Sequence, residues 1–199
     1  MEIKNISKKD LAAVVEVHKD SFKGFFLTEL GDNFLITYYN SLRTDPKAVL
    51  LGIFDGNNLL GFCAATSLSK GYNSYLVKRN FLTYLIVGTR ILFSKPTAIL
   101  RLVRNFSKSD STIEDNGEYA ELLSIGVSSN KQGFGIGKKI LMELEVELSK
   151  KGCVNISLTT DFYNNEKTIK FYEGLGYEIY YEFVAYPNRK MYRMMKKIN

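Results

Sequence analysis

The most informative stretch of this sequence is Gln132-Gly133-Phe134-Gly135-Ile136-Gly137-Lys138. An amphipathic helix is predicted from Gly135 to Lys150, so it begins within this stretch. Glycine lets the backbone approach a ligand closely and present successive N–H groups. The first turn of a helix adds unpaired N–H donors and the positive end of its dipole, and Lys138 and Lys139 add charge. The segment therefore predicts a site that binds a pyrophosphate.

Two other phosphate-binding loops do not fit this glycine segment. A P-loop needs Gly-x-x-x-x-Gly-Lys-Ser/Thr, and that spacing does not precede Lys138. A dinucleotide-binding loop needs Gly-x-Gly-x-x-Gly near the first strand of a βαβ unit, with an acidic residue about 20 residues later. Here the order is Gln-x-x-Gly-x-Gly, and the loop lies past the middle of the chain. A plain tight turn stays the alternative for the segment taken by itself.

Length and composition are those of an ordinary globular protein. The chain has 199 residues, of which 45% are hydrophobic and 24% charged, and this balance excludes a disordered chain. Cys63 and Cys153 lack metal-ligand spacing, so we expect two buried free thiols in a reducing compartment and no metal site. The N-terminus is too polar for a signal peptide. The longest apolar run, Phe81 to Phe93, is shorter than the roughly 20 residues of a membrane span. We expect a cytoplasmic protein.

Local patterns predict most of the secondary structure. Ser7 and Asp10 form a capping-box pattern before the first helix, Asp55-Gly56 is a hairpin turn signal, and Gly176 is placed to end the last helix. Strands and helices alternate in the C-terminal part, which predicts a mixed α/β sheet. Strands are expected at 2–6, 48–54, 59–65, 118–127, 154–160, 177–185 and 190–197, and helices at 11–22, 33–42, 135–150 and 165–175.

Residues 69–109 form a basic insert with eight Lys and Arg residues and no Asp or Glu. Its pattern predicts two amphipathic helices divided near Pro96. Three interpretations stay open. The insert is a helical cap with a solvated basic face, a lid that attracts an anionic acceptor such as a nucleotide-linked amino sugar, or a surface for anionic lipid. Its apolar residues also allow a homodimer contact. Nucleic-acid binding is not expected, because no recognition motif accompanies the charge.

The glycine segment resembles the pyrophosphate loop of the GCN5-related N-acetyltransferase (GNAT) family, Arg/Gln-x-x-Gly-x-Gly/Ala. The preceding residues 121–127, ELLSIGV, are similar to the fourth strand of that family. A second match lies downstream, in the family's order: Asn165-x-x-Thr168-x-x-Phe171-Tyr172-Glu173-x-x-Gly176-Tyr177. The N-terminal part fits the family layout more loosely, and the basic insert is not part of the family core.

The resemblance implies a mixed α/β, GNAT-like acyl-CoA N-acyltransferase fold, with a central twisted sheet of about six to seven strands flanked by helices. We expect a single domain over residues 1–199 with the helical insert at about 69–110. The resemblance also implies an enzyme that moves an acetyl group from acetyl-CoA to an amine by direct attack in a ternary complex. The acceptor is expected to be a small molecule such as an amino sugar, with a hydroxyl acceptor less favoured. The alternatives are a non-catalytic CoA-binding sensor or scaffold and a protein N-acetyltransferase.

The resemblance assigns cofactor contacts along the chain. The backbone of Ile125 and Val127 is expected to pair with the pantetheine arm, Asn165 to contact the cofactor, and the fourth and fifth strands to splay apart. The run from Phe22 to Phe26 is expected to begin the acceptor-side loop or to be core. The backbone expected at the pyrophosphate is that of Gln132, Gly133, Phe134, Gly135, Ile136 and Gly137, with Lys138 beside it.

Two catalytic roles follow from the same resemblance. Tyr172 is expected to protonate the leaving CoA thiolate, and its alternative is a packing residue of its helix. Glu121 is the candidate base, directly or through a water, and its alternative is a strand-end charge facing solvent or a lysine. Some relatives carry a glutamate five residues before the motif asparagine. Thr160 stands there in this chain, which weakens any transfer of their base and of their protein N-terminal substrates. His18, the one histidine, is expected to pack on the apolar face of the first helix.

Overall fold

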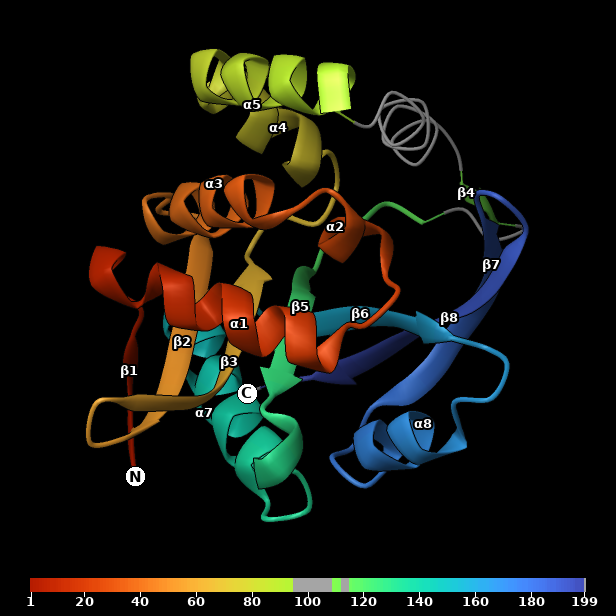
Figure 1. The fold of residues 1–199 in the computed structure, drawn as a ribbon. Helices are drawn as coiled ribbons and strands as arrows, with labels where there is room; N and C mark the ends of the chain where they lie inside the picture. Colours follow the sequence, from red (N-terminus) through yellow and green to blue (C-terminus); the bar gives the residue numbers. More distant parts are fainter. Residues whose placement is uncertain (95–108, 112–114, 199) are drawn as a thin grey trace.

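The computed structural model describes residues 1–94, 109–111 and 115–198. In these ranges the strands form one eight-stranded sheet, in the order β1-β2-β3-β5-β6-β8-β7-β4. Helices cover both faces of the sheet (Figure 1). The predicted mixed α/β fold is confirmed.

The strands lie within about two residues of their predicted positions. One addition is β4, a three-residue strand paired to β7, which no sequence pattern announced and which makes the sheet wider than expected. The strands are β1 (Glu2–Asn5), β2 (Ala48–Asp55), β3 (Asn58–Thr66), β4 (Ser109–Ser111), β5 (Ala120–Val127), β6 (Asn155–Asp161), β7 (Glu178–Ala185) and β8 (Arg189–Lys197).

The described helices are α1 (Leu11–Ser21), α2 (Phe26–Glu29), α3 (Asp32–Arg43), α4 (Tyr72–Arg79), α5 (Phe81–Ser94), α7 (Ile136–Lys150) and α8 (Glu166–Glu173). The prediction that the insert divides near Pro96 needs correction, because two helices already lie before that residue. Asn80 separates them: its side chain donates to the Leu76 carbonyl at 3.0 Å, a local bond that competes with the helix and ends α4. The helix expected after Pro96 lies outside the described residues.

The predicted helix signals act as expected. Ser7 donates to the Asp10 carboxylate through its backbone N–H at 2.9 Å and through its hydroxyl at 2.6 Å. This capping box opens a short 3₁₀ turn that runs into α1. At the other end of the chain, Gly176 has a φ of +87° and follows α8, a backbone state that glycine adopts without strain.

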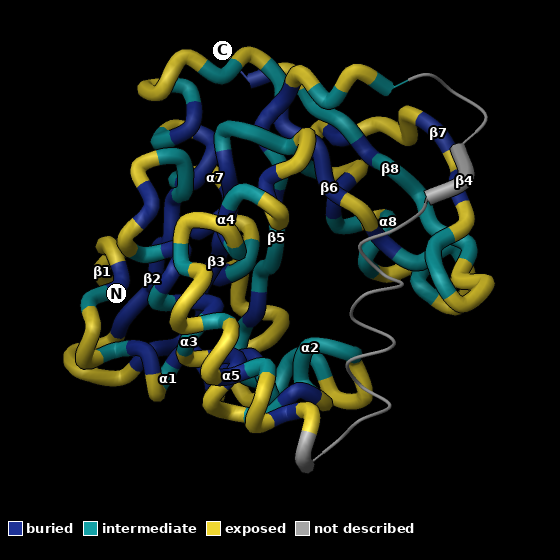
Figure 2. The backbone as a smooth tube through the Cα atoms, turned by 90° about the horizontal axis from the view of Figure 1, so that it is seen from above, coloured by how far each residue is buried: buried dark blue, intermediate teal, exposed yellow. Residues whose placement is uncertain are grey.

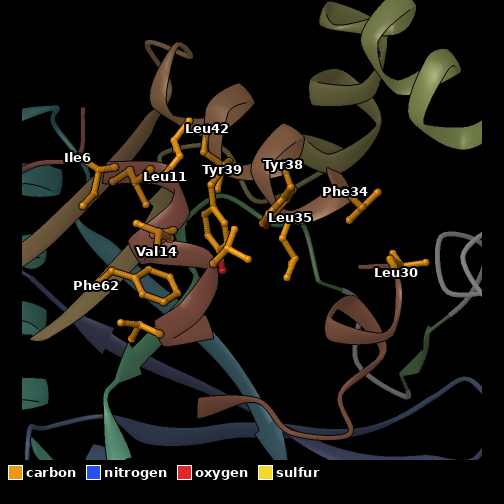
Figure 3. Close-up of a cluster of buried hydrophobic side chains, with 14 of the residues drawn as sticks. Ile6, Leu11, Val14, Leu30, Phe34, Leu35, Tyr38, Tyr39, Leu42 and Phe62 are labelled. Carbon is orange, nitrogen blue, oxygen red and sulfur yellow. The ribbon is translucent and has the colours of Figure 1, made fainter. Parts of the chain in front are cut away.

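Two hydrophobic clusters lie on opposite faces of the sheet. Figure 3 shows the one beneath α1 and α3, where Val14, Leu35, Tyr39 and Phe62 lie together. The other cluster lies beneath α7 and includes its buried row Ile140, Leu141, Leu144 and Leu148. Because β2 and β3 contribute to both clusters, they are nearly continuous apolar runs rather than alternating ones.

The two cysteines are free thiols. Cys63 on β3 is fully buried, as expected, and burial raises the pKa of its thiol well above the usual range. Cys153 is only partly buried, so the expectation of two buried thiols holds for the first alone. A buried, protonated thiol is a poor nucleophile, which leaves Cys63 as a core residue.

The sheet divides between β5 and β6. These strands run parallel, and they pair only at Ala120 with Ile156 and at Glu121 with Ser157. Beyond Glu121, β5 continues to Val127 along β3 alone. Figure 2 shows the two parts of the sheet separating from this point. β5 and β6 correspond to the fourth and fifth strands of the family layout, so the splay implied by the family resemblance is present.

Helix α5 is apolar on two opposite faces. Val87 and Ile91 are buried, and Tyr84 meets Phe34 of α3 with 6.2 Å between ring centroids. The outer face carries five large apolar side chains that are 49–73% exposed: Phe81, Leu82, Leu85, Ile86 and Leu92. Figure 1 places α5 outside α3 and α4. The helical-cap interpretation expected a solvated basic face, whereas the exposed face of α5 is largely apolar, so that interpretation stays a prediction. The lid, lipid-surface and dimer interpretations stay predictions.

Gly61 on β3 offers a test of the pairing between β3 and β5. A Cβ at this position would lie 2.8 Å from the backbone oxygen of Gly126. A backbone oxygen cannot relieve this steric clash by changing rotamer, as a side chain can. Gly61→Ala is therefore expected to lower the free energy of unfolding by about 1–3 kcal/mol. Urea unfolding measures the change.

The matched control is Gly88→Ala in α5, where an added Cβ meets open space. Alanine is favoured over glycine inside a helix by about 1 kcal/mol, so this variant should be as stable as wild type or more stable. Equal stability of Gly61→Ala and wild type would show that the two strands are not as close as described.

Candidate functional site

The divergence of β5 and β6 opens a cavity of about 940 Å³. One wall is β5 from Leu122 to Val127, and the opposite wall is β6 from Leu158 to Asp161 together with α8. The glycine segment closes one end, and Phe22 and Phe25 line the side of α1 and α2. The cavity therefore brings together the two sequence motifs that lie some 30 residues apart.

The glycine segment shapes the start of α7. Gly133 and Gly135 have φ values of +83° and +73°, and a Cβ on either would meet open space. These left-handed residues turn the chain so that the first residues of α7, Ile136 to Lys138, line the cavity. Phe134 is different: its side chain is 75% exposed and is not part of the wall. Any contact of Phe134 with a cofactor would have to come from its backbone.

From Leu122 onward, no described strand pairs with the edge of β5 that faces β6. An extended ligand can add to such an edge as a further strand. Ile125 and Val127, predicted for this role, both line the cavity. The Val127 carbonyl already accepts hydrogen bonds from Ser21 Oγ and Gln132 Nε2, each at 3.2 Å. Gln132 thus ties the glycine segment to β5 through its side chain, a contact that the motif did not predict.

A bulge interrupts β5 on its other edge. Ala64 of β3 pairs with Ser124 and Ala65 pairs with Leu122, so Leu123 is the extra residue. A bulge re-aims the side chains around it. As a result Leu123 and Ser124 both face α1 and α3: Leu123 packs on that hydrophobic cluster, and Ser124 Oγ lies 3.2 Å from Tyr39 Oη.

Charge in the cavity is mostly positive. Five basic residues line its described wall: Lys131, Lys138, Lys167, Lys170 and Arg189. Asp161 is the one carboxylate of that wall, and both of its oxygens accept from Arg189, one of them at 2.6 Å. The uncompensated charge favours an anionic ligand that carries several phosphates.

Asn165 connects the two elements on the β6 side. Its Nδ2 donates to Thr160 Oγ1 at 2.6 Å and to the Asp161 carbonyl at 2.9 Å. These bonds hold the start of α8 against the end of β6. Asn165 also lines the cavity, so the predicted cofactor contact is sterically possible and stays a prediction.

Tyr172 lies on α8 and is one of the residues that line the cavity. The residue is 7% exposed and packs against Tyr177 with 5.6 Å between ring centroids. Burial raises the pKa of the Tyr172 phenol well above its ordinary value of 10. The hydroxyl therefore keeps its proton at neutral pH, as a general acid must.

Glu121 lies at the last paired position before the strands separate. Its carboxylate accepts from Arg193 at 2.8 Å and from Ser69 at 2.8 Å. The alternative of a charge facing solvent or a lysine is wrong, because its partner is a half-buried arginine. The cavity wall begins one residue later, at Leu122, so a base role for Glu121 needs a water between it and the acceptor. That role stays a prediction.

The sequence profile of the acetyltransferase (GNAT) family matches residues 11–177. The chain belongs to this family. It is therefore an acyltransferase, and the cavity lies between the two motifs from which the GNAT resemblance was drawn.

Solved GNAT structures share the fold. Aminoglycoside 6'-acetyltransferase type Ii is 19% identical, with a TM-score of 0.64 over 100% of this chain and 98% of that chain. The ribosomal-protein-S18-alanine N-acetyltransferase from Escherichia coli is 15% identical, with a TM-score of 0.63 over 100% and 94%. The PaiA N-acetyltransferase from Thermoplasma acidophilum, solved with coenzyme A, is 18% identical, with a TM-score of 0.55 over 98% of each chain. Comparison with curated protein sequences gave no match.

Two further properties concern the described part of the GNAT chain only. Within residues 1–94, 109–111 and 115–198, no helix is both long enough and apolar enough to cross a membrane. In the same ranges no three side chains of His, Cys, Asp or Glu are grouped so that they could hold a metal ion.

His18 is buried beside the GNAT cavity, at 2% exposure. Its ring lies 4.7 Å from that of Phe22 and 6.4 Å from that of Phe62, centroid to centroid, as the packing prediction requires. The sequence did not reveal its polar contact: Nδ1 lies 2.7 Å from Tyr39 Oη, which in turn reaches Ser124. Burial lowers the pKa of His18 to about 4, so the imidazole is neutral at physiological pH.

Arg189 is a wall residue that sequence reasoning missed. Besides its pairing with Asp161, its guanidinium lies 5.2 Å from the ring centroid of Phe25. This contact links the start of β8 to the acceptor-side loop across the GNAT cavity. The aromatic run from Phe22 to Phe26 pointed to that loop, but nothing local marked Arg189 as its partner.

Burial of His18 gives stability a defined pH dependence. The unfolded chain protonates this imidazole near its ordinary pKa of 6.5, whereas the folded chain does so near 4. The stabilisation is complete above the higher value and is lost as pH falls through this window, because the unfolded state then binds the extra proton. The free energy of unfolding should fall by up to about 1.4 kcal/mol per pH unit from this group.

Urea unfolding at several pH values checks this for wild type and His18→Asn. The variant should lack the additional slope, since the chain has one histidine. Identical slopes in the two proteins would mean that His18 is accessible to protons in the folded state.

Proposed function

We propose that this enzyme transfers an acetyl group from acetyl-CoA to the amine of a small molecule, directly and within a ternary complex. The observation that carries the proposal is the cavity between β5 and β6. It combines an unpaired strand edge, a helix N-terminus and a cationic wall, and acetyl-CoA needs all three. The strand edge suits the amide-containing pantetheine arm. The start of α7 suits the pyrophosphate.

The donor's phosphates would be held by a few groups of this chain. The backbone N–H groups of the glycine segment and of the first turn of α7 are the hydrogen-bond donors, and Lys138 adds a positive charge in the same wall. GNAT membership supports acyl-CoA as the donor. The acyl group would then lie near the bulge at Leu123, in the part of β5 that no longer pairs with β6.

The chemistry is one displacement at the thioester carbon. The amine nitrogen forms the new C–N bond, and the C–S bond breaks with its electron pair on sulfur. The thiolate takes the proton of the Tyr172 hydroxyl, which solvent later replaces. The proton of the amine passes through a water to the Glu121 carboxylate, which lies next to Leu122 of the cavity wall.

The acceptor half of the cavity supports a small molecule such as an amino sugar. Phe22 and Phe25 offer aromatic faces on which the C–H face of a sugar ring can lie. Arg189 and Asp161 provide a charged donor and an acceptor beside them. A peptide N-terminus is the alternative acceptor. Thr160 counts against it, because some relatives carry a glutamate at this position and this chain does not.

Substitution of Gly135 tests the donor site. Gly135→Asp places a carboxylate at the N-terminus of α7, where it repels a pyrophosphate. We expect wild type to bind acetyl-CoA with micromolar affinity by calorimetry and the variant to bind roughly 10²-fold more weakly.

The matched control is Gly152→Asp, just past the far end of α7. Gly152 also has positive φ (+83°) and open space around it, so the backbone strain is alike and the location differs. This control should bind as wild type does. Absence of binding by wild type would refute acetyl-CoA as the donor.

Substitution of Tyr172 tests the acid. Tyr172→Phe keeps the ring in the wall and removes the proton, so the turnover number should fall about 10²-fold while acetyl-CoA affinity stays unchanged. Release of the CoA thiol is followed with a panel of primary amines that includes glucosamine. The control is Tyr177→Phe, which removes a hydroxyl that donates to the buried Glu145 carboxylate. Undiminished turnover in Tyr172→Phe would assign the proton to another donor.

A further inference from the structure

A chain of three hydrogen-bonding side chains runs from the core to the cavity wall. His18 Nδ1 lies 2.7 Å from Tyr39 Oη, and Tyr39 Oη lies 3.2 Å from Ser124 Oγ. The three residues come from α1, α3 and β5. Figure 3 shows Tyr39 among apolar side chains, with Val14, Leu35 and Phe62 around it. Only the last member, Ser124, lines the cavity.

Packing alone does not account for a histidine at the inner end. Its other ring nitrogen, Nε2, is buried and has no hydrogen-bond partner among the residues that the structure describes. An unsatisfied buried polar atom lowers stability, and an apolar ring would fill the same space between Phe22 and Phe62 without that cost. The contribution of His18 must therefore come from Nδ1, the atom that reaches Tyr39.

The imidazole fixes the direction of the whole chain. A hydroxyl can donate or accept, so the polarity of a Tyr–Ser chain is open until one end is set. A phenol is a stronger acid than an imidazole N–H, and an imidazole nitrogen is a stronger base than a phenol oxygen. Tyr39 therefore donates to Nδ1, and the 2.7 Å separation is typical of an O–H donor. Ser124 then donates to Tyr39.

We propose that Ser124 Oγ accepts a hydrogen bond from the attacking amine of the acceptor, and that Tyr39 and His18 are positioning residues that keep the lone pairs of Ser124 turned toward the cavity. The inference rests on the proposed acetyl transfer. It places the nucleophile on the α1 and α3 side of β5, where Phe22 and Phe25 also line the wall. An amine whose N–H is held there has its lone pair free for the thioester carbon.

The chain orients the nucleophile and does not take its proton. Protonated His18 would be an unpaired charge between Phe22 and Phe62, which burial disfavours strongly. The acceptor class follows from the same polarity: it is a nucleophile with at least one N–H, or less well O–H, to donate to Ser124. Ser124 is thus a substrate-contacting residue, whereas Tyr39 and His18 act through it.

Nitrogen NMR of the single histidine tests the chain without any ligand. In protein labelled with ¹⁵N-histidine, we expect one neutral imidazole with its proton on Nε2 and an Nδ1 signal shifted by a hydrogen bond. Tyr39→Phe should remove that shift, and Ser124→Ala should reduce it, because the phenol loses its own donor. Tyr38→Phe, a buried α3 neighbour outside the chain, is the matched control and should leave the signal in place.

Two NMR outcomes would overturn the proposal. A proton on Nδ1 would reverse the polarity of the chain, and an Nδ1 signal that ignores Ser124→Ala would disconnect His18 from the cavity. Because these spectra are recorded on the ligand-free protein, they are independent of the proposed function. Failure of that function would appear instead as a wild type that does not bind acetyl-CoA.

Kinetics with the best amine of the panel separates positioning from structure. Ser124→Ala and Tyr39→Phe should each lower kcat/KM about ten-fold with unchanged acetyl-CoA affinity, and the double variant should lose no more than the worse single one. His18→Asn, which can keep a polar atom near the Nδ1 position, should retain more activity than His18→Leu. Losses that multiply in the double variant would show that Tyr39 does not act through Ser124.

Discussion

The guanidinium of Arg193 holds the sheet together at the point where it divides. Its Nη1 donates to Glu121 of β5 at 2.8 Å and to Ser157 of β6 at 3.1 Å, and these two residues form the last backbone pair before the strands separate. Arg193 itself lies on β8, opposite β6. A partly buried, charge-assisted bond across a fork resists further opening, because breaking it would leave charges with poor access to water. Because Arg193 holds β5 and β6 together at this pair, it sets the point from which the strands separate and the cavity begins.

The rest of the site follows from that fork. On one side, β5 keeps its β3 partner and presents a free edge, with the bulge at Leu123 turning Ser124 toward α3. On the other, Asn165 holds α8 to the end of β6, which places Tyr172 in the opposite wall. The two hydrophobic clusters on either face of the sheet keep the parts in place without strand pairing between them. The cluster beneath α7 includes Leu122 of β5 and Leu158 of β6, so one core supports both walls of the cavity.

Local sequence predicted what local physics determines. The capping box at Ser7, the left-handed Gly176 after α8 and the periodicity of the helices depend on neighbours in the chain, and each lies where expected. The break at Asn80 and the short β4 were missed, since one depends on a single side-chain bond and the other on pairing with β7. The contacts of Arg193, and the path from His18 to Ser124, join residues up to 85 positions apart, and no periodic pattern records such pairings. Family motifs located the cavity walls but not the side chains that connect them.

The burial of His18 has a consequence for how the enzyme meets its surroundings. Histidine is the one side chain whose ordinary pKa lies between about pH 5 and 8, and this chain has a single histidine, held neutral by the core. His18 therefore adds no charge to the folded protein across that range. A change in the rate of the proposed acetyl transfer between pH 5 and 8 would therefore have to come from the ionisation of a group other than His18.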